Sequence, residues 1–232
     1  MKAGTLHLIP APLGETFEYP QYLKTIIQTI EYFIVENEKS ARKILSMFIG
    51  QEFSESRHYA VLDEHTSCES VPELLKPLLK GMTSGILSEA GLPCIADPGA
   101  ALIAEAHKHT ITIIPHPGPS SLFMALMASG LNGQRFMFDG YIPIEQEHRI
   151  KRLKYLEQLS LKEHMSIGFI ETPYRNQKLF EVIKTVLKPE TQLCIASGLM
   201  TREEFIATKP VKTWKHTPYI FSKTPAVFIL QA

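Results

Sequence analysis

Cysteine is scarce in the sequence, and its three copies argue against two common kinds of site. Cys68, Cys94 and Cys194 lack the short spacing of a zinc site, and an odd number of cysteines cannot all pair. A reduced, cytoplasmic setting is therefore expected rather than a disulfide scaffold. The nine histidines do not cluster at ligand spacing either, so no metal site is predicted.

Long apolar runs and an excess of one charge are missing too. No apolar stretch approaches the ~18 residues that a membrane span needs, and residues 1–4 lead directly into a strand pattern rather than a secretory leader. Lysine plus arginine and aspartate plus glutamate both number 24, so the formal net charge is zero. This balance argues against a protein held on nucleic acid by bulk charge alone, although it is compatible with a local basic patch.

The two common phosphate-binding motifs are absent as well. The chain has no Gly-x-x-x-x-Gly-Lys-Ser/Thr loop, and no Gly-x-Gly-x-x-Gly follows the first expected strand. Residues 10–14, Pro-Ala-Pro-Leu-Gly, stand there instead, and prolines lack the N–H groups that would donate to a pyrophosphate. The expected ligand is one without phosphates, held by backbone carbonyls and apolar contacts, and S-adenosylmethionine suits such a site.

Strand and helix patterns alternate along the N-terminal half of the sequence. Ser70 is expected to cap the third helix, and Pro77 is expected to kink or split it. The alternation predicts a mostly parallel sheet with helices on both faces. The expected strands are residues 5–9, 32–35, 85–87 and 111–114, and the expected helices are residues 22–30, 39–49, 70–79 and 100–109.

The pattern changes after Ser120, because strands outnumber helices in the rest of the chain. A second α/β domain with antiparallel strand pairs is therefore predicted. Three prolines between Pro115 and Pro119 exclude regular structure there. We accordingly place the two domains at residues 1–116 and 117–232.

Two loops rich in glycine and proline, residues 88–99 and 115–121, mark the candidate site. Each follows an expected strand and precedes an expected helix. In an open α/β sheet such turns lie at the carboxyl edge, where small ligands bind. A simpler interpretation of residues 97–99, Asp-Pro-Gly, is a helix cap and turn, and Ser120 suits capping as well as ligand contact.

Five motifs occur in order along nearly the whole chain, at residues 9–14, 88–99, 117–121, 128–131 and 171–175. Together they resemble the tetrapyrrole methylase superfamily, and most closely its branch that methylates a ribose 2′-hydroxyl of small-subunit ribosomal RNA. The resemblance implies two α/β domains with S-adenosylmethionine in the cleft between them. It also implies a homodimer, with ribosomal RNA or the small ribosomal subunit as the partner.

The resemblance also implies, by position, which residues contact the ligands. Arg42, Tyr174 and Arg175 would contact the substrate. The cofactor would contact residues from both domains: Pro12, Glu89, Ala90, Gly91, Leu92, Pro93, Ile95, Ser120, Ser121, Ile170, Glu171, Leu199, Pro225 and Ala226.

The chain departs from the family pattern in parts that are expected to face the substrate. In residues 36–45 the family's aspartate and first arginine are replaced, while Glu36, Arg42 and Lys43 remain. Glu15 stands where the family usually has asparagine. The chain also stops just past its last expected strand, without the C-terminal extension that many relatives carry.

The expected reaction is direct in-line methyl transfer, in which alignment and desolvation supply much of the rate. A ribose hydroxyl needs a base for its proton, and Glu36, Glu89 and Asp97 are the candidates because all three lie near expected strand ends. Two alternatives stay open at this point. One is C-methylation of a corrin or porphyrin precursor, and the other is a non-catalytic protein that binds S-adenosylmethionine.

Several other features have a structural interpretation as their default. The charged helix at residues 145–159 is expected to be exposed, with contact to an RNA backbone as the alternative. Phe136, Phe138 and Tyr141 are expected in the core rather than in a platform for stacking bases. His116, inside the proline-rich turn, is expected to be structural more often than functional.

Overall fold

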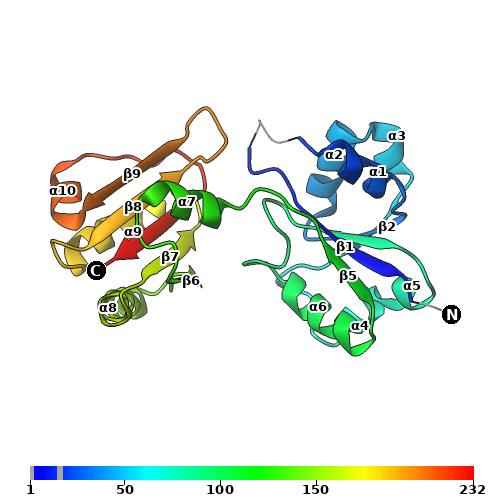
Figure 1. Cartoon of the computed structure of the whole chain (residues 1–232), viewed down its shortest axis with the longest axis horizontal. Helices are drawn as coiled ribbons and strands as arrows, with labels where there is room; N and C mark the ends of the chain where they lie inside the picture. The colour runs from blue at the N-terminus through cyan, green and yellow to red at the C-terminus, as the bar shows by residue number, and fades with distance from the viewer. Residues whose placement is uncertain (1–2, 15–17) are drawn as a thin grey trace. The chain divides into compact units, whose positions relative to one another are not determined.

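The computed structural model describes residues 3–14 and 18–232 (Figure 1). Glu15, one of the departures from the family pattern, lies outside the described residues. The chain folds into two compact units, Met1–Ser120 and Ser121–Ala232. The expected junction, after residue 116, lies in the proline-rich segment that precedes Ser121.

The first unit is built on a five-stranded sheet in the order β3-β2-β4-β1-β5, and every pairing in it is parallel. The expectation of a mostly parallel sheet is confirmed. The sequence pattern did not indicate β3, an edge strand in which no side chain is fully buried and the apolar signal is weak. The strands are β1 (Thr5–Ile9), β2 (Tyr32–Val35), β3 (His58–Val61), β4 (Ser84–Leu87) and β5 (Thr112–Pro115).

Helices cover both faces of this sheet, as expected (Figure 1). Ile9 and Phe33 pack with the helices α1 and α2, whereas their strand neighbours Leu6 and Ile34 pack with α4 and α6 on the opposite face. The helices are α1 (Gln21–Gln28), α2 (Glu38–Phe48), α3 (Gln51–Glu55), α4 (Val71–Leu74), α5 (Lys76–Leu79) and α6 (Gly99–Lys108).

The helix expected at residues 70–79 is split into α4 and α5, with Pro77 in the first turn of α5. This agrees with the limit that proline sets on a continuing helix. Ser70 is the N-cap residue of α4, as expected, but its side chain makes no capping bond. The Ser70 hydroxyl instead pairs with the Ser67 hydroxyl at 2.8 Å.

The second unit has a mixed sheet in the order β6-β7-β10-β8-β9. Strand β10 is antiparallel to both β7 and β8, β8 is antiparallel to β9, and only the β6–β7 pair is parallel. The predicted antiparallel pairs are therefore confirmed. The strands are β6 (Phe136–Tyr141), β7 (Ser166–Glu171), β8 (Gln192–Ser197), β9 (Phe205–Pro210) and β10 (Ala226–Gln231).

One face of this second sheet packs against α7 (Ser121–Ser129), through a cluster that includes Leu122, Ala125 and Val227. The opposite face packs against α8 (Gln146–Glu163), α9 (Asn176–Val186) and α10 (Val211–His216), around the buried Trp214 (Figure 1). None of the described helices is long and apolar enough to cross a membrane.

Two expectations about side chains in the second unit are wrong. Arg149, in the helix expected to be exposed, is 1% exposed and donates to the carbonyls of Pro143 (3.1 Å) and Ile144 (2.8 Å). These bonds fix the segment that enters α8. Tyr141 and Phe136, expected in the core, are exposed at the edge strand β6, whereas Phe138 does pack against the core.

Candidate functional site

The carboxyl edge of the first sheet brings three segments of the expected site together. Ile9 on β1 and Val35 on β2 both pair with Leu87 on β4, so these three strands end side by side. The residues that follow are the proline loop 10–14, Glu36, and the loop 88–99. The parallel arrangement thereby places at one edge residues that are up to 89 positions apart in the sequence.

Backbone contacts join the loops at this edge. The amide of Ala11 donates to the Gly91 carbonyl at 2.7 Å, and the amide of Gly91 donates back to the Ala11 carbonyl at 3.1 Å. Gly91 has φ +72°, and a Cβ there would lie 3.2 Å from Leu13 Cδ2. Gly118 packs so closely on Pro10 that a Cβ would lie 2.1 Å from the proline Cβ. Both glycines are thus required by the close approach of these loops.

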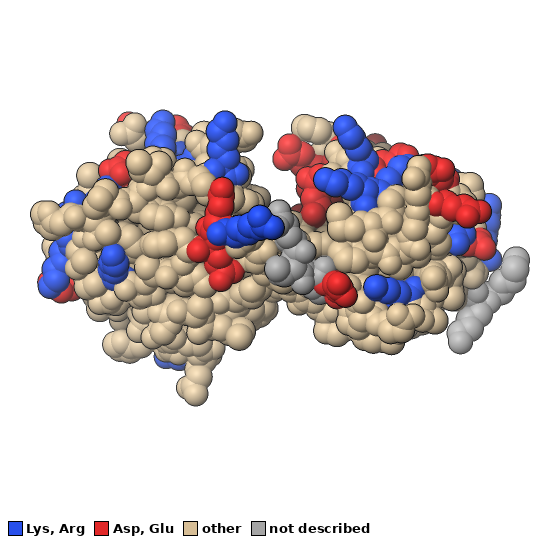
Figure 2. Space-filling view, turned by 90° about the horizontal axis from the view of Figure 1, so that it is seen from above, with Lys and Arg blue, Asp and Glu red and all other residues tan. Residues whose placement is uncertain are grey.

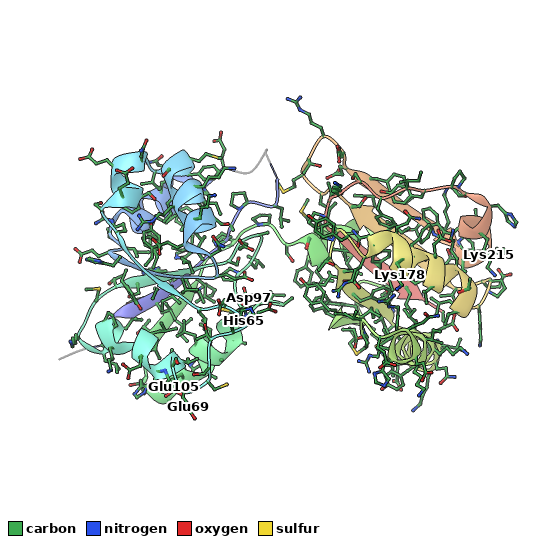
Figure 3. All side chains as sticks on the ribbon, turned by 180° about the vertical axis from the view of Figure 1, so that it is seen from behind. His65, Glu69, Asp97, Glu105, Lys178 and Lys215 are labelled. Atoms are coloured by element: carbon green, nitrogen blue, oxygen red, sulfur yellow. The ribbon has the colours of Figure 1, made fainter. Side chains whose placement is uncertain are left out.

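The loop 88–99 holds an unusual backbone. Cys94 and Ala96 have φ of +69° and +63°, a region that costs non-glycine residues about 1–3 kcal/mol each. Asp97 stabilises this conformation, because its two carboxylate oxygens accept from the amides of Cys94 and Gly99, both at 2.8 Å (Figure 3). The interpretation of Asp97 as a cap and turn residue is therefore supported, because each of its oxygens already accepts one backbone hydrogen bond.

Glu36 has the most perturbed carboxyl group at this edge. It is half-buried and lines a small hollow together with Ser88 and Asp97. Burial raises the pKa of Glu36, and the negative charges of Glu89, Asp97 and Glu64 raise this pKa further, against a partial lowering by the Glu89 backbone amide. A carboxylate that holds a proton more strongly than usual is suited to general base chemistry.

Glu89 is held by a residue that the sequence did not single out. The Ser40 hydroxyl donates to Glu89 Oε1 at 2.8 Å, and Asn37 Oδ1 caps α2 by accepting from the Ser40 amide at 3.0 Å. The first turn of α2 is therefore fixed to the loop 88–99. The signal for Ser40 was weak, because it lies 49 positions from Glu89.

The other cofactor-binding candidates of the first unit differ in accessibility. Ala90 and Ile95 are exposed, Leu92 is half-buried, and Pro93 is buried. Pro12 lies in the loop that Ala11 joins to Gly91. Of the remaining two candidates, Ser120 ends the first unit and Ser121 begins α7, and both are half-buried.

Arg42, a candidate for substrate contact, is engaged within its own unit. It donates to Glu38 Oε1 and to the Ser54 carbonyl, both at 2.8 Å, and its guanidinium lies 4.1 Å from the centre of the Tyr59 ring. These contacts join α2 to α3 and β3. Arg42 therefore has a structural role, and its positive charge is paired with Glu38.

In the second unit the predicted cofactor residues also gather at one sheet edge. Ala226, at the start of β10, pairs with Glu171 on one side and with Ser197 on the other. The amide of Gly198 donates to the Pro225 carbonyl at 3.1 Å. Ile170, Glu171, Leu199, Pro225 and Ala226 therefore come from three segments that meet in the fold.

Glu171 is the most buried charged group at this second edge. Its Oε1 accepts from the Thr172 amide at 2.8 Å and from Arg175, through Nε at 2.8 Å and Nη2 at 2.6 Å. Its Oε2 is buried and has no hydrogen-bond partner among the described residues. A buried oxygen without a partner is costly, and a ligand that donates to it would remove that cost.

Two further polar or aromatic features were missed or undervalued. His7 Nδ1 and His116 Nε2 lie 2.9 Å apart, and burial lowers the pKa of both rings. The sequence feature that could have indicated this pair is His7, a histidine inside the apolar run of β1. Tyr141, 53% exposed, ends β6 and pairs with Ile170, so it belongs to the edge that carries Glu171. In the part of the chain that the structure describes, no three His, Cys, Asp or Glu side chains could hold a metal ion.

Sequence comparison finds relatives along most of the chain, although no family model matches it. Three of these relatives are named ribosomal RNA small subunit methyltransferase I. The protein of Vibrio cholerae is 27% identical over 91% of this chain and 72% of its own length. That of Buchnera aphidicola is 28% identical over 99% and 76%, and that of Escherichia coli O157:H7 is 28% identical over 90% and 70%.

Solved structures of two other methyltransferases share the fold. The methyltransferase CobJ has a TM-score of 0.65 and 15% identity, with 99% of this chain and 94% of CobJ covered. Uroporphyrin-III C-methyltransferase from Thermus thermophilus, in complex with S-adenosylhomocysteine, has a TM-score of 0.56 and 13% identity. The aligned part covers 98% of this chain and 97% of that one.

Proposed function

We propose that this protein, a member of the tetrapyrrole methylase superfamily and an S-adenosylmethionine-dependent methyltransferase, methylates a ribose 2′-hydroxyl of small-subunit ribosomal RNA. The names of the relatives support the RNA acceptor. The observation that carries the proposal is the half-buried Glu36, whose raised pKa suits removal of a hydroxyl proton, beside the loop 88–99.

The described residues fit the cofactor. S-adenosylmethionine supplies a methyl group that is already activated on a cationic sulfur. The first edge offers the carboxylate of Glu89 and a proline loop with few amides, which suits a cation better than a phosphate. In the second unit the unpartnered Oε2 of Glu171 is suited to accept a hydrogen bond from the nucleoside. The cofactor-binding residues expected from the resemblance remain our proposal for this site.

The chain's own contribution is alignment, exclusion of water and removal of one proton. Bound S-adenosylmethionine would supply the methyl group, and a carboxylate oxygen of Glu36 would take the proton of the acceptor hydroxyl. Among the three candidate bases, Asp97 has both oxygens bonded to backbone amides, and Glu89 is held by Ser40. Glu36 is therefore the base that the geometry favours.

Methyl transfer is the test of this proposal. Purified protein and labelled S-adenosylmethionine are incubated with small ribosomal subunits that lack their native methylations, and the label is mapped by nuclease digestion. Label on a single 2′-hydroxyl is the expected result. If the protein binds the cofactor but leaves these subunits unlabelled, the RNA proposal fails, and labelling of corrin or porphyrin precursors then separates the second enzymatic candidate from a non-catalytic cofactor-binding protein.

The proposal extends to assembly and location. Because the resemblance implies a homodimer, we propose that two copies of this chain associate. Sedimentation equilibrium with and without cofactor measures that association directly. An acceptor in the ribosomal subunit also implies a cytoplasmic protein.

A further inference from the structure

The turn after β7 presents an aromatic ring and a fixed guanidinium next to each other. Tyr174 is 86% exposed, the highest value among the large apolar and aromatic side chains that the structure describes. A ring with this exposure buries little area in the fold, so packing gives no reason for a tyrosine at this position. Arg175, the next residue, is 26% exposed.

The backbone of this turn is well defined. The Arg175 amide donates to the Thr172 carbonyl at 2.9 Å, and the Asn176 amide donates to the same carbonyl at 3.2 Å. Pro173 occupies the second position of the turn, where its fixed φ restricts the chain. Tyr174 is thereby presented from a constrained backbone, so stacking a ligand on its ring requires no further ordering of the main chain.

Glu171 fixes the orientation of Arg175. Both Nε and Nη2 of Arg175 donate to Glu171 Oε1, which occupies one edge of the planar guanidinium. The end-on edge, formed by Nη1 and the second N–H of Nη2, has no acceptor among the described residues. That edge matches two oxygens of one phosphate group. Because the Glu171 carboxylate is fully buried, the guanidinium cannot leave without stranding a buried charge.

The surroundings favour an anion beside an aromatic surface. The turn leads into α9, whose first turn contains no acidic side chain and whose N-terminus favours negative charge. Lys178 is exposed near the start of that helix (Figure 3). Tyr141, at the end of β6, adds a second exposed aromatic side chain to the same sheet edge.

We propose that residues 172–175 form a recognition corner for one unpaired nucleotide of the RNA acceptor, with its base stacked on Tyr174 and its phosphate bound by Arg175, which Glu171 positions. This inference rests on the proposed RNA acceptor, since it assigns a contact within the same site. It specifies single-stranded rather than duplex RNA, because only an unstacked base can lie on the ring.

Fluorescence titration separates the two halves of this corner. The probe is a short single-stranded RNA with the target ribosomal sequence, in which 2-aminopurine replaces the base beside the methylated ribose. Stacking on Tyr174 quenches the probe in the wild type. We expect Tyr174→Ala to abolish the quenching and weaken binding about tenfold, which is the order of one base–aromatic stack, and Tyr174→Phe to restore both.

Arg175 is tested by salt dependence rather than by quenching. In Arg175→Gln we expect the slope of log K against log salt concentration to fall by about 0.7, the value for one lost phosphate contact on a single strand, with the quenching retained. Tyr174→Ala should leave that slope unchanged. The matched controls are Tyr155→Ala, a 51% exposed tyrosine on α8, and Arg135→Gln, whose partner is Glu163, and both are expected to bind as the wild type does.

Binding of S-adenosylmethionine, measured by calorimetry, shows whether each variant is folded and distinguishes the two possible failures. If the wild type binds the cofactor and the RNA, and the Tyr174 and Arg175 variants behave as their controls, the recognition corner is wrong while the proposed function stands. If the wild type binds the cofactor but not the RNA, the proposed acceptor fails and the corner fails with it. Should Arg175→Gln lose cofactor binding, Arg175→Lys keeps the charge, and an unchanged affinity for RNA in that variant would contradict the two-oxygen contact.

Discussion

The carboxyl edge of the first sheet and the corresponding edge of the second unit use carboxylates in different ways. At the first edge burial raises the pKa of Glu36, and nearby negative groups raise this pKa further, so the carboxylate binds a proton more readily than usual. At the second edge Glu171 is more deeply buried, yet it is paired with Arg175 and fixes a cation. Burial by itself therefore does not assign a role to a carboxylate, because its partners decide whether it carries a proton or holds another group.

The surface charge likewise shows that individual groups matter more than an overall property of the molecule. Figure 2 shows acidic and basic side chains intermingled on the face that it draws, which agrees with a formal net charge of zero. Bulk attraction to phosphates is weak for such a surface. Recognition of RNA must then depend on a few oriented groups such as Arg175, and the chemistry on a few perturbed groups such as Glu36.

Replacing the proposed base is the largest single test of the first edge. We expect Glu36→Gln to lower kcat by about 100-fold or more, since general base catalysis typically contributes ~10²- to 10⁴-fold, with little change in the affinity for the cofactor. Single-turnover methyl transfer to the RNA gives the rate, and calorimetry gives the affinity. A kcat within threefold of the wild type would place the base elsewhere.

The matched control for this variant is Glu89→Gln, which keeps Glu36 but removes a neighbouring negative charge. Because the charge of Glu89 raises the pKa of Glu36, its removal should shift the acidic limb of the pH–rate profile to lower pH. The limb moves to lower pH because, without the charge of Glu89, Glu36 loses its proton at a lower pH. A limb that moves to higher pH would show that Glu36 is not the group that titrates.

Replacing the loop-holding carboxylate is expected to affect stability more than chemistry. In Asp97→Asn one acceptor oxygen becomes an NH₂ donor, so one of the two bonds from the amides of Cys94 and Gly99 is lost, and the other loses the charge that strengthens it. A loss of about 2 kcal/mol in the free energy of unfolding is expected, within the range for hydrogen bonds to charged groups. Urea denaturation measures this loss.

Asp63 provides the comparison for Asp97. It also accepts a backbone bond within a turn, from the His65 amide at 3.0 Å, but it lies outside the loop 88–99. Asp63→Asn should therefore cost less stability and leave methyl transfer unchanged. If Asp97→Asn keeps full stability but loses kcat as severely as Glu36→Gln, then Asp97 belongs to the chemistry and the difference between the two carboxylates disappears.

The sequence predicted both edges well, because they depend on local patterns. Short apolar runs and glycine- and proline-rich turns were sufficient to identify the two α/β units, the loop 88–99 and Glu36 at a strand end, whereas Glu171 was implied only by the resemblance. Periodicity carries this information because parallel strands end at a common edge. The fold class followed from the same signals.

The sequence could not assign roles to those residues, because the roles depend on tertiary contacts. Asp97 was one of three equivalent candidates until its two backbone bonds were seen. Ser40 reaches Glu89 only because α2 begins beside the loop 88–99. Arg149 looked exposed on a charged helix, yet its guanidinium satisfies carbonyls in the segment before that helix. None of these contacts leaves a pattern in one sequence.

The smallest expected effect concerns the buried pair His7 and His116. Both lie in the first unit, so we expect acid to lower the stability of that unit through this pair. Burial lowers the pKa of His7 and of His116, and the proximity of His116 lowers that of His7 further. The unfolded chain then binds protons at a higher pH than the folded one. Stability is fully present above the unfolded histidine pKa of about 6.5, and it is lost as the pH falls below that value toward the lowered folded pKa values.

The two units can be followed separately in one denaturation experiment. Trp214 is the only tryptophan of the chain and is buried in the second unit, so its fluorescence reports on that unit. Hydrogen exchange of the His116 amide, which donates to the Leu8 carbonyl at 3.1 Å, reports on the first. On acidification through pH 6.5, protection of this amide should fall, and the double variant His7→Gln/His116→Gln should lose much of that dependence. If the double variant loses protection with acid as the wild type does, the pair is not the source of the effect, and other groups of the first unit must bind the protons.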